Sequence, residues 1–238
     1  MNHLNWPAAL RNIRYKDAPV VLKNFLNDPS QYVSWKDVED VINKDACYIE
    51  LIRNQIKVDI PGFKYFWFGK HTHHKKYIFD GINSGDTFII NQYTNYKKEI
   101  NDLCASIEEC YDVVVDAHVY GGLKSDCKSF KPHVDVPANF ICQIEGTTHW
   151  QVYGNKSSAL LNHYQTNTFN IPDNTLEVEL DVMLEPGDVI YLPSRTFHGA
   201  FPSGKRLSIS ISCKSREATS DYIPLDRNYY NINHDQYS

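Results

Sequence analysis

Two histidines and an aspartate constrain the fold of this chain more than any other feature. His133 and Asp135 lie two residues apart in KPHVDVP, and His198 ends the later run LEPGDVIYLPSRTFH. In a β-strand, residues i and i+2 point to the same side, so the first two side chains can reach one ion. Two imidazoles and one carboxylate on one side of an iron leave its opposite side open for other ligands. The chain must therefore bring His198 back beside His133 on a later strand.

The segments around this triad indicate a β-barrel. FICQI and HWQVY are typical of short strands, and Pro186-Gly187-Asp188 is a turn signal before the apolar run VIYLP. After His198, the run RLSISIS alternates, with the apolar residues on one face and Arg206 and the serines on the other. In a small ligand-holding barrel, such a polar face can line the cavity. We expect a mainly β protein with flanking helices, in which Arg206 points toward the metal.

The 238 residues are expected to form one domain with a sizeable core. Its barrel core would span about residues 113–213, after an α/β flank over about 1–112. In that flank we expect a strand at PVVLKNF, helices near SWKDVEDVINK and INDLCASIEECY, and two strands around a basic turn in GFKYFWFGKHTHHKKYIF. The polar tail 214–238 could wrap the barrel or cover its mouth, and the sequence leaves both open.

Composition excludes several functional classes. A net charge of −5 and a pI near 6.0 argue against a nucleic-acid-binding surface. We find no signal peptide and no apolar run of membrane-spanning length, so no membrane association is expected. The six cysteines form no CxxC pair and are typical of reduced thiols in a cytoplasmic protein.

The barrel region resembles the JmjC-type cupins, the iron(II)- and 2-oxoglutarate-dependent oxygenases that include the ribosomal oxygenases and asparaginyl hydroxylases. The shared motifs are the HxD at His133, the FxxQxxGxxxW run from Phe140 to Trp150, and PGDxxYLP followed by His198. This resemblance covers most of residues 18–213. It implies a double-stranded β-helix, or jelly-roll, barrel in which His133, Asp135 and His198 bind iron(II).

The same resemblance implies a hydroxylase that uses 2-oxoglutarate and O2. Its substrate would be a small molecule, an amino acid, or a peptide or protein side chain. The ribosomal oxygenases continue into a dimerisation region and a winged-helix module, whereas few residues follow the last expected barrel strand here. We therefore favour a small molecule or short peptide as substrate, and regard a homodimer as possible.

One position departs from the family pattern. Many relatives carry a cation two residues after the glycine of QxEG, where it pairs with the distal carboxylate of 2-oxoglutarate, but this chain has Thr148. Arg206 and Ser208 resemble the Arg-x-Ser pair that binds this carboxylate in other 2-oxoglutarate oxygenases. A guanidinium forms a bidentate, permanently charged contact with a carboxylate. We assign the contact to Arg206, assisted by Ser208 and Thr148. Asn139 matches a family asparagine that contacts the metal-side carboxylate.

Other interpretations stay open at this point. The chain could be a metal-binding cupin of another class, such as an isomerase or a 2-oxoglutarate-independent dioxygenase, which Thr148 favours. It could also be a non-catalytic binding module, because a fold does not fix a function. Several singled-out residues have ordinary structural alternatives, as surface, turn, core or solvated-loop residues: Arg206, Asn139, Trp150, Tyr120, His71, His73 and His74.

Overall fold

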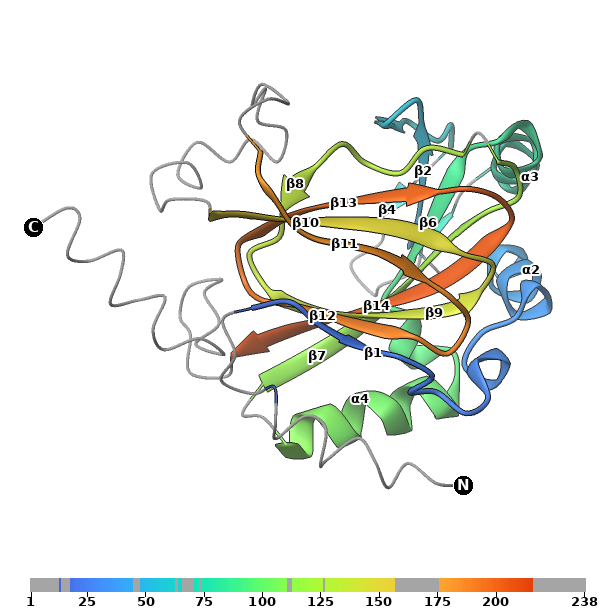
Figure 1. The fold of residues 1–238 in the computed structure, drawn as a ribbon. Coiled ribbons are helices and arrows are strands. Elements are labelled where there is room, and N and C mark those ends of the chain that lie inside the picture. The colour runs from blue at the N-terminus through green and yellow to red at the C-terminus, as the bar shows by residue number, and fades with distance from the viewer. Residues whose placement is uncertain are drawn as a thin grey trace, which may run out of the picture.

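Two antiparallel β-sheets face each other at the centre of the molecule (Figure 1). This is a computed structural model, and it describes the following residues: 13, 18–44, 48–62, 64–65, 71–72, 74–110, 113–125, 127–156 and 176–215.

The larger sheet consists of β1 (Val20–Leu22), β2 (Tyr48–Arg53), β3 (Ile56–Val58), β6 (Thr87–Asn91), β7 (Val113–Gly122), β9 (Ala138–Glu145), β12 (Val189–Leu192) and β14 (Arg206–Ser215). Their order in this 8-stranded sheet is β1-β12-β9-β14-β7-β6-β2-β3. The 4-stranded sheet consists of β8 (His133–Val134), β10 (Thr148–Lys156), β11 (Val178–Leu184) and β13 (Thr196–Pro202). Its order is β11-β10-β13-β8. This arrangement confirms the predicted jelly-roll barrel.

The remaining elements lie outside these two sheets. A short hairpin pairs β4 (Lys64–Tyr65) with β5 (His71–Thr72). The helices are η2 (Pro29–Gln31), α2 (Trp35–Asn43), α3 (Lys75–Ser84), η3 (Tyr93–Asn95) and α4 (Lys98–Cys110). No helix in the described part of the chain is both long and apolar enough to cross a bilayer.

Strands of the N-terminal flank join the larger sheet. Its strand β1 pairs with β12, and β6 pairs with β7, so the flank extends both edges of the larger sheet. Four consecutive residues of β6, Thr87–Ile90, are buried. A strand covered on both faces needs a neighbour for its backbone hydrogen bonds, which β2 and β7 provide.

One expectation for the flank was partly wrong. Residues 63–79 do contain two paired strands, but helix α3 already begins at Lys75. The Nδ1 atom of His74 accepts a hydrogen bond from the Tyr77 N–H at 3.1 Å and so caps this helix, while Ile78 and Ile82, four residues apart, are buried. Helix α2 begins with a full capping box, in which the side chains of Ser34 and Asp37 each accept a hydrogen bond from the other's backbone N–H.

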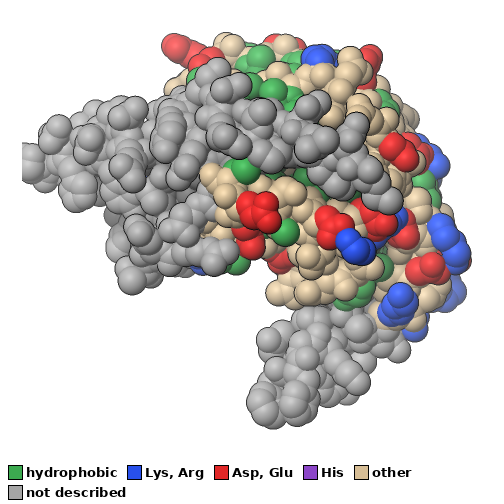
Figure 2. All heavy atoms as spheres, turned by 90° about the horizontal axis from the view of Figure 1, so that it is seen from below, with side chains coloured by type: hydrophobic (Ala, Val, Ile, Leu, Met, Phe, Trp, Pro, Cys, Tyr) green, Lys and Arg blue, Asp and Glu red, His purple; other side chains and the backbone are tan. Residues whose placement is uncertain are grey.

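Alternation in β7 and β14 separates the core from the polar interior of the barrel. One face of these strands lies in the hydrophobic core, where β7 packs against α4 beneath it (Figure 1). The buried residues of this face include Val115, Ala117, Val119, Leu207, Ile209 and Ile211. The opposite face carries Arg206, Ser208 and Ser210, which line an internal cavity. Seen from below, the described surface shows acidic and basic side chains interspersed (Figure 2).

Candidate functional site

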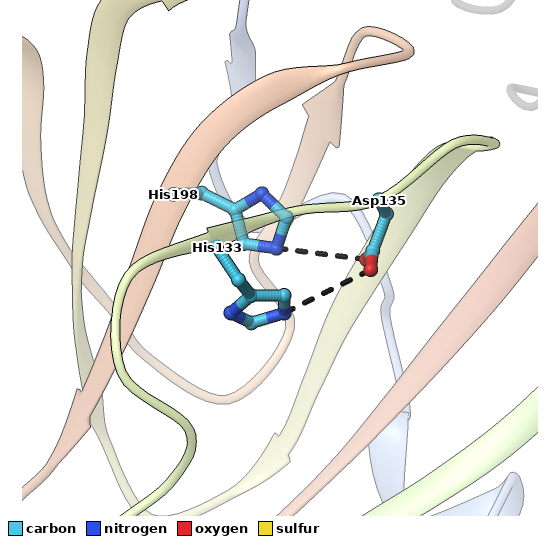
Figure 3. A group of neighbouring side chains, drawn as sticks. All are labelled: His133, Asp135 and His198. Atoms are coloured by element: carbon cyan, nitrogen blue, oxygen red, sulfur yellow. Dashed lines mark ion pairs between the residues drawn. The ribbon is translucent and has the colours of Figure 1, made fainter. Parts of the chain in front are cut away.

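The fold brings the three predicted metal ligands together. His133 on β8 and His198 on β13 are directly paired in the antiparallel register, and Asp135 follows β8. The His133 Nε2 atom lies 3.8 Å from Asp135 Oδ1, and the His198 Nε2 atom lies 3.6 Å from Asp135 Oδ2 (Figure 3). One ligand atom from each residue lies within 4.8 Å of the other two. The three side chains can therefore contact one ion.

Backbone carbonyls fix the tautomer of both imidazoles. The Nδ1 atom of His133 lies 2.8 Å from the Lys131 carbonyl oxygen, and that of His198 lies 2.9 Å from the Thr196 carbonyl oxygen. A carbonyl only accepts, so each Nδ1 carries the hydrogen and each Nε2 keeps its lone pair for a metal. Burial and the nearby His133 lower the pKa of His198 to about 4, so its imidazole is neutral at neutral pH. Two imidazoles that turn their Nε2 atoms to one point and a carboxylate form a donor set that fits iron(II).

Asn139 holds the aspartate in place. Its Nδ2 donates to Asp135 Oδ2 at 2.9 Å, and its Oδ1 accepts from the Ser212 hydroxyl at 2.7 Å. The amide is 1% exposed, and Asn139 does not line the cavity. Its expected contact with the co-substrate stays a prediction. The geometry instead gives Asn139 the role of orienting a metal ligand through Asp135.

We therefore expect Asn139→Ala to weaken metal binding about 10- to 100-fold while the barrel still folds. The substitution leaves Asp135 Oδ2 without its side-chain donor and lets the carboxylate rotate. Metal affinity measured by calorimetry checks this, with Ser106→Ala as the control, because that hydroxyl donates to a helix carbonyl on α4. An unchanged metal affinity in Asn139→Ala would show that Asp135 is held by other contacts.

A cavity extends from the triad into the barrel between the two sheets. Its walls include the triad and most of the polar residues predicted from the sequence. The lining residues are Tyr120, Ser129, Phe130, His133, Asp135, Ile141, Thr148, Trp150, His198, Ala200, Arg206, Ser208 and Ser210.

Arg206 is a buried cation without an anionic partner among the described residues. It is 2% exposed; its Nη2 donates to the Thr87 hydroxyl at 3.3 Å, and its Nη1 has no hydrogen-bond acceptor there. Burial lowers the pKa of Arg206 to about 10, so the guanidinium is still charged at neutral pH. A buried, unpaired charge is strongly unfavourable. The cavity is therefore built to receive an anion, and a carboxylate fits a guanidinium.

Thr148 lines the same cavity. Its hydroxyl is buried with no partner among the described residues. In the turn between β9 and β10, Gly146, at φ +68°, packs closely on the start of β14, so a Cβ there would lie 3.1 Å from the Arg206 Cα. The cavity wall thus contains one charged and one neutral donor that lack partners among the described residues.

Two aromatic residues for which packing had seemed the simpler role reach the cavity. Trp150 belongs to a hydrophobic cluster with Ile141 and Val152, and it also lines the cavity. Tyr120 lines the cavity as well, and burial raises the pKa of its phenol, which stays protonated at neutral pH.

Some residues at the site carried no sequence signal. Phe130 packs edge-on against His133, with ring centroids 5.6 Å apart, and Ser129 precedes it in the cavity wall. Both lie in an irregular segment that matches no motif. In the basic run, His74 is exposed and caps α3, while the side chain of His71 and all of His73 lie outside the described residues.

A family model described as the JmjC domain matches residues 89–220, more than half of the chain. The chain belongs to the JmjC domain family. This confirms the predicted family and, with it, the predicted cofactors, because JmjC domains are iron(II)- and 2-oxoglutarate-dependent oxygenases.

Named relatives fall in the same group. The chain is 32% identical over 142 residues to the bifunctional lysine-specific demethylase and histidyl-hydroxylase NO66 of Drosophila mojavensis. The matched segment covers 58% of this chain and 15% of that protein. It is 34% identical over 99 residues to ribosomal oxygenase 1 of Gallus gallus, covering 40% of this chain and 16% of that protein. The chain thus spans only a small part of these relatives' length.

Solved structures share the fold. The ribosomal oxygenase YcfD of Escherichia coli, in complex with cobalt and 2-oxoglutarate, superposes with a TM-score of 0.59 at 19% identity. The match covers 91% of this chain and 53% of YcfD. The YcfD complex with cobalt and succinic acid gives a TM-score of 0.60 at 20% identity, over 91% and 53% of the two chains.

Proposed function

We propose that this chain is an iron(II)- and 2-oxoglutarate-dependent oxygenase that hydroxylates a protein side chain. One observation carries the proposal. A complete set of three metal ligands and an unpaired, buried guanidinium lie in the wall of one cavity. A metal alone would leave Arg206 unpaired, whereas a dicarboxylate such as 2-oxoglutarate can contact both the metal and the guanidinium.

The residues of this chain bind, orient and shield the reactants. When bound, iron and 2-oxoglutarate supply the chemistry of oxygen activation. His133, Asp135 and His198 would hold the metal with the tautomers already set. Arg206, with Thr148 and Ser208, would hold the distal carboxylate of the co-substrate. Apolar wall residues keep water away from the reacting atoms; they are Phe130, Ile141, Trp150 and Ala200.

The relatives support a protein substrate over the small molecule that chain length had favoured. Their names specify ribosomal oxygenases and histidyl hydroxylation. We therefore propose a side chain of a ribosomal protein, with histidine as the first candidate. Lysine demethylation is the second candidate, since it also stands in the name of a relative.

Mass spectrometry separates these candidates. We expect a ribosomal protein mixture treated with this protein, iron(II) and 2-oxoglutarate in air to gain one oxygen on a specific side chain. His198→Ala, which lacks one metal ligand, is the control and should give no product. Loss of a lysine methyl group would support the demethylase instead. Turnover of 2-oxoglutarate with small molecules alone would contradict a protein substrate.

A further inference from the structure

Arg206, in the wall of the cavity, is hydrogen-bonded to a residue that lies outside that wall. Its Nη2 donates to the hydroxyl of Thr87 on β6, and this hydroxyl in turn donates to the Lys128 carbonyl oxygen at 3.2 Å. Thr87 is 1% exposed and does not line the cavity. It therefore contacts the guanidinium from outside the cavity and does not contact the space that a ligand would fill.

The directions of the Arg206–Thr87 and Thr87–Lys128 hydrogen bonds are both determined. A hydroxyl has one hydrogen, and the Lys128 carbonyl can only accept, so Thr87 gives its hydrogen to Lys128 and turns a lone pair toward Arg206. The guanidinium is confined on another side as well. A Cβ at Gly122 would lie 3.1 Å from the Arg206 Nη1 atom and 2.8 Å from the Cys127 Sγ atom. The side chain is thus confined, while its Nη1 has no hydrogen-bond acceptor among the described residues.

The Lys128 carbonyl, which accepts from Thr87, belongs to a segment that forms part of the site. Ser129 and Phe130, which follow Lys128, line the cavity, and the Lys131 carbonyl accepts from His133. Thr87 therefore links the cation on β14 to the segment that leads into β8.

We propose that Thr87 is a positioning residue that orients Arg206 toward the distal carboxylate of 2-oxoglutarate. This inference rests on the proposed function. A long side chain such as arginine loses rotamer freedom when it is held in one geometry. Thr87 holds Arg206 in this geometry before the co-substrate arrives, and such preorganisation strengthens binding.

Two ligands test this role in the iron(II)-loaded protein under anaerobic conditions. 2-Oxoglutarate has the distal carboxylate, whereas 2-oxopentanoate has a carbon chain of the same length without it. Thr87→Val keeps the shape and removes the hydroxyl. We expect it to weaken 2-oxoglutarate binding about 5- to 10-fold and to leave 2-oxopentanoate binding unchanged. Thr87→Ser should restore 2-oxoglutarate binding.

A double-mutant cycle separates positioning from packing. In an Arg206→Ala background, Thr87→Val should have no further effect on 2-oxoglutarate binding, because the group it orients is gone. Equal weakening of both ligands by Thr87→Val, or additive losses in the double mutant, would overturn the positioning role. Unchanged 2-oxoglutarate affinity in Thr87→Val would also overturn it. Failure of the wild-type protein to bind 2-oxoglutarate would instead contradict the proposed function.

Discussion

We expect His198→Ala to abolish oxygenase activity and to weaken iron binding severely while the protein still folds. The same result is expected for His133→Ala and Asp135→Ala, because each removes one of three ligands and leaves an incomplete set. Activity assays, metal titration and circular dichroism together check this. Asp135→Glu should also be poor, since the added methylene displaces the oxygen from a bond length of about 2 Å, with zinc–oxygen distances as the guide.

A second histidine–aspartate pair, which joins β10 to β11, provides a matched control. His149 Nε2 lies 2.7 Å from Asp181 Oδ1, and neither residue lines the cavity. His149→Ala removes the same kind of side chain from a histidine–aspartate pair and should leave iron binding intact. Wild-type turnover in any of the three triad variants would refute the metal site.

We expect Arg206→Ala to weaken 2-oxoglutarate binding about 10- to 100-fold, the loss of a charge-assisted contact worth about 1.5–3 kcal/mol. Arg206→Lys should recover only part of the affinity, because the bidentate fork is lost. Thr148→Ala should have a much smaller effect, since its hydroxyl contributes no charge. Co-substrate affinity measured by anaerobic titration ranks these variants.

Lys205→Ala provides the control for this series. Lys205 adjoins Arg206, but its side chain is 51% exposed and pairs with Glu145. Its loss should not affect co-substrate affinity. Equal affinities in wild type and Arg206→Ala would mean that the anion is held elsewhere in the cavity.

Local rules predicted the parts of the site that lie within one strand. The two-residue spacing of His133 and Asp135, and the alternation after Arg206, follow from strand geometry alone. The return of His198 followed from the turns before it. The roles of Asn139 and Thr87 could not be predicted in this way. Each depends on a partner on β14, Ser212 or Arg206, which the order of strands in the sheet brings close.

Other expectations depended on context in the same way. Helix α3 replaced part of an expected strand because His74 caps it and its apolar spacing buries one face. Strand β6 joined the larger sheet because a strand buried on both faces needs hydrogen-bonding neighbours on both edges. The predicted cytoplasmic location and possible homodimer remain predictions.

Anaerobic addition of 2-oxoglutarate to the iron(II)-loaded protein, followed by visible absorption, tests the central claim most directly. A charge-transfer band should appear and saturate in the wild-type protein, should be absent in His198→Ala, and should require far more 2-oxoglutarate in Arg206→Ala. Absence of the band in the wild-type protein, or an identical titration in Arg206→Ala, would contradict a cavity in which the triad and Arg206 bind the two ends of one co-substrate.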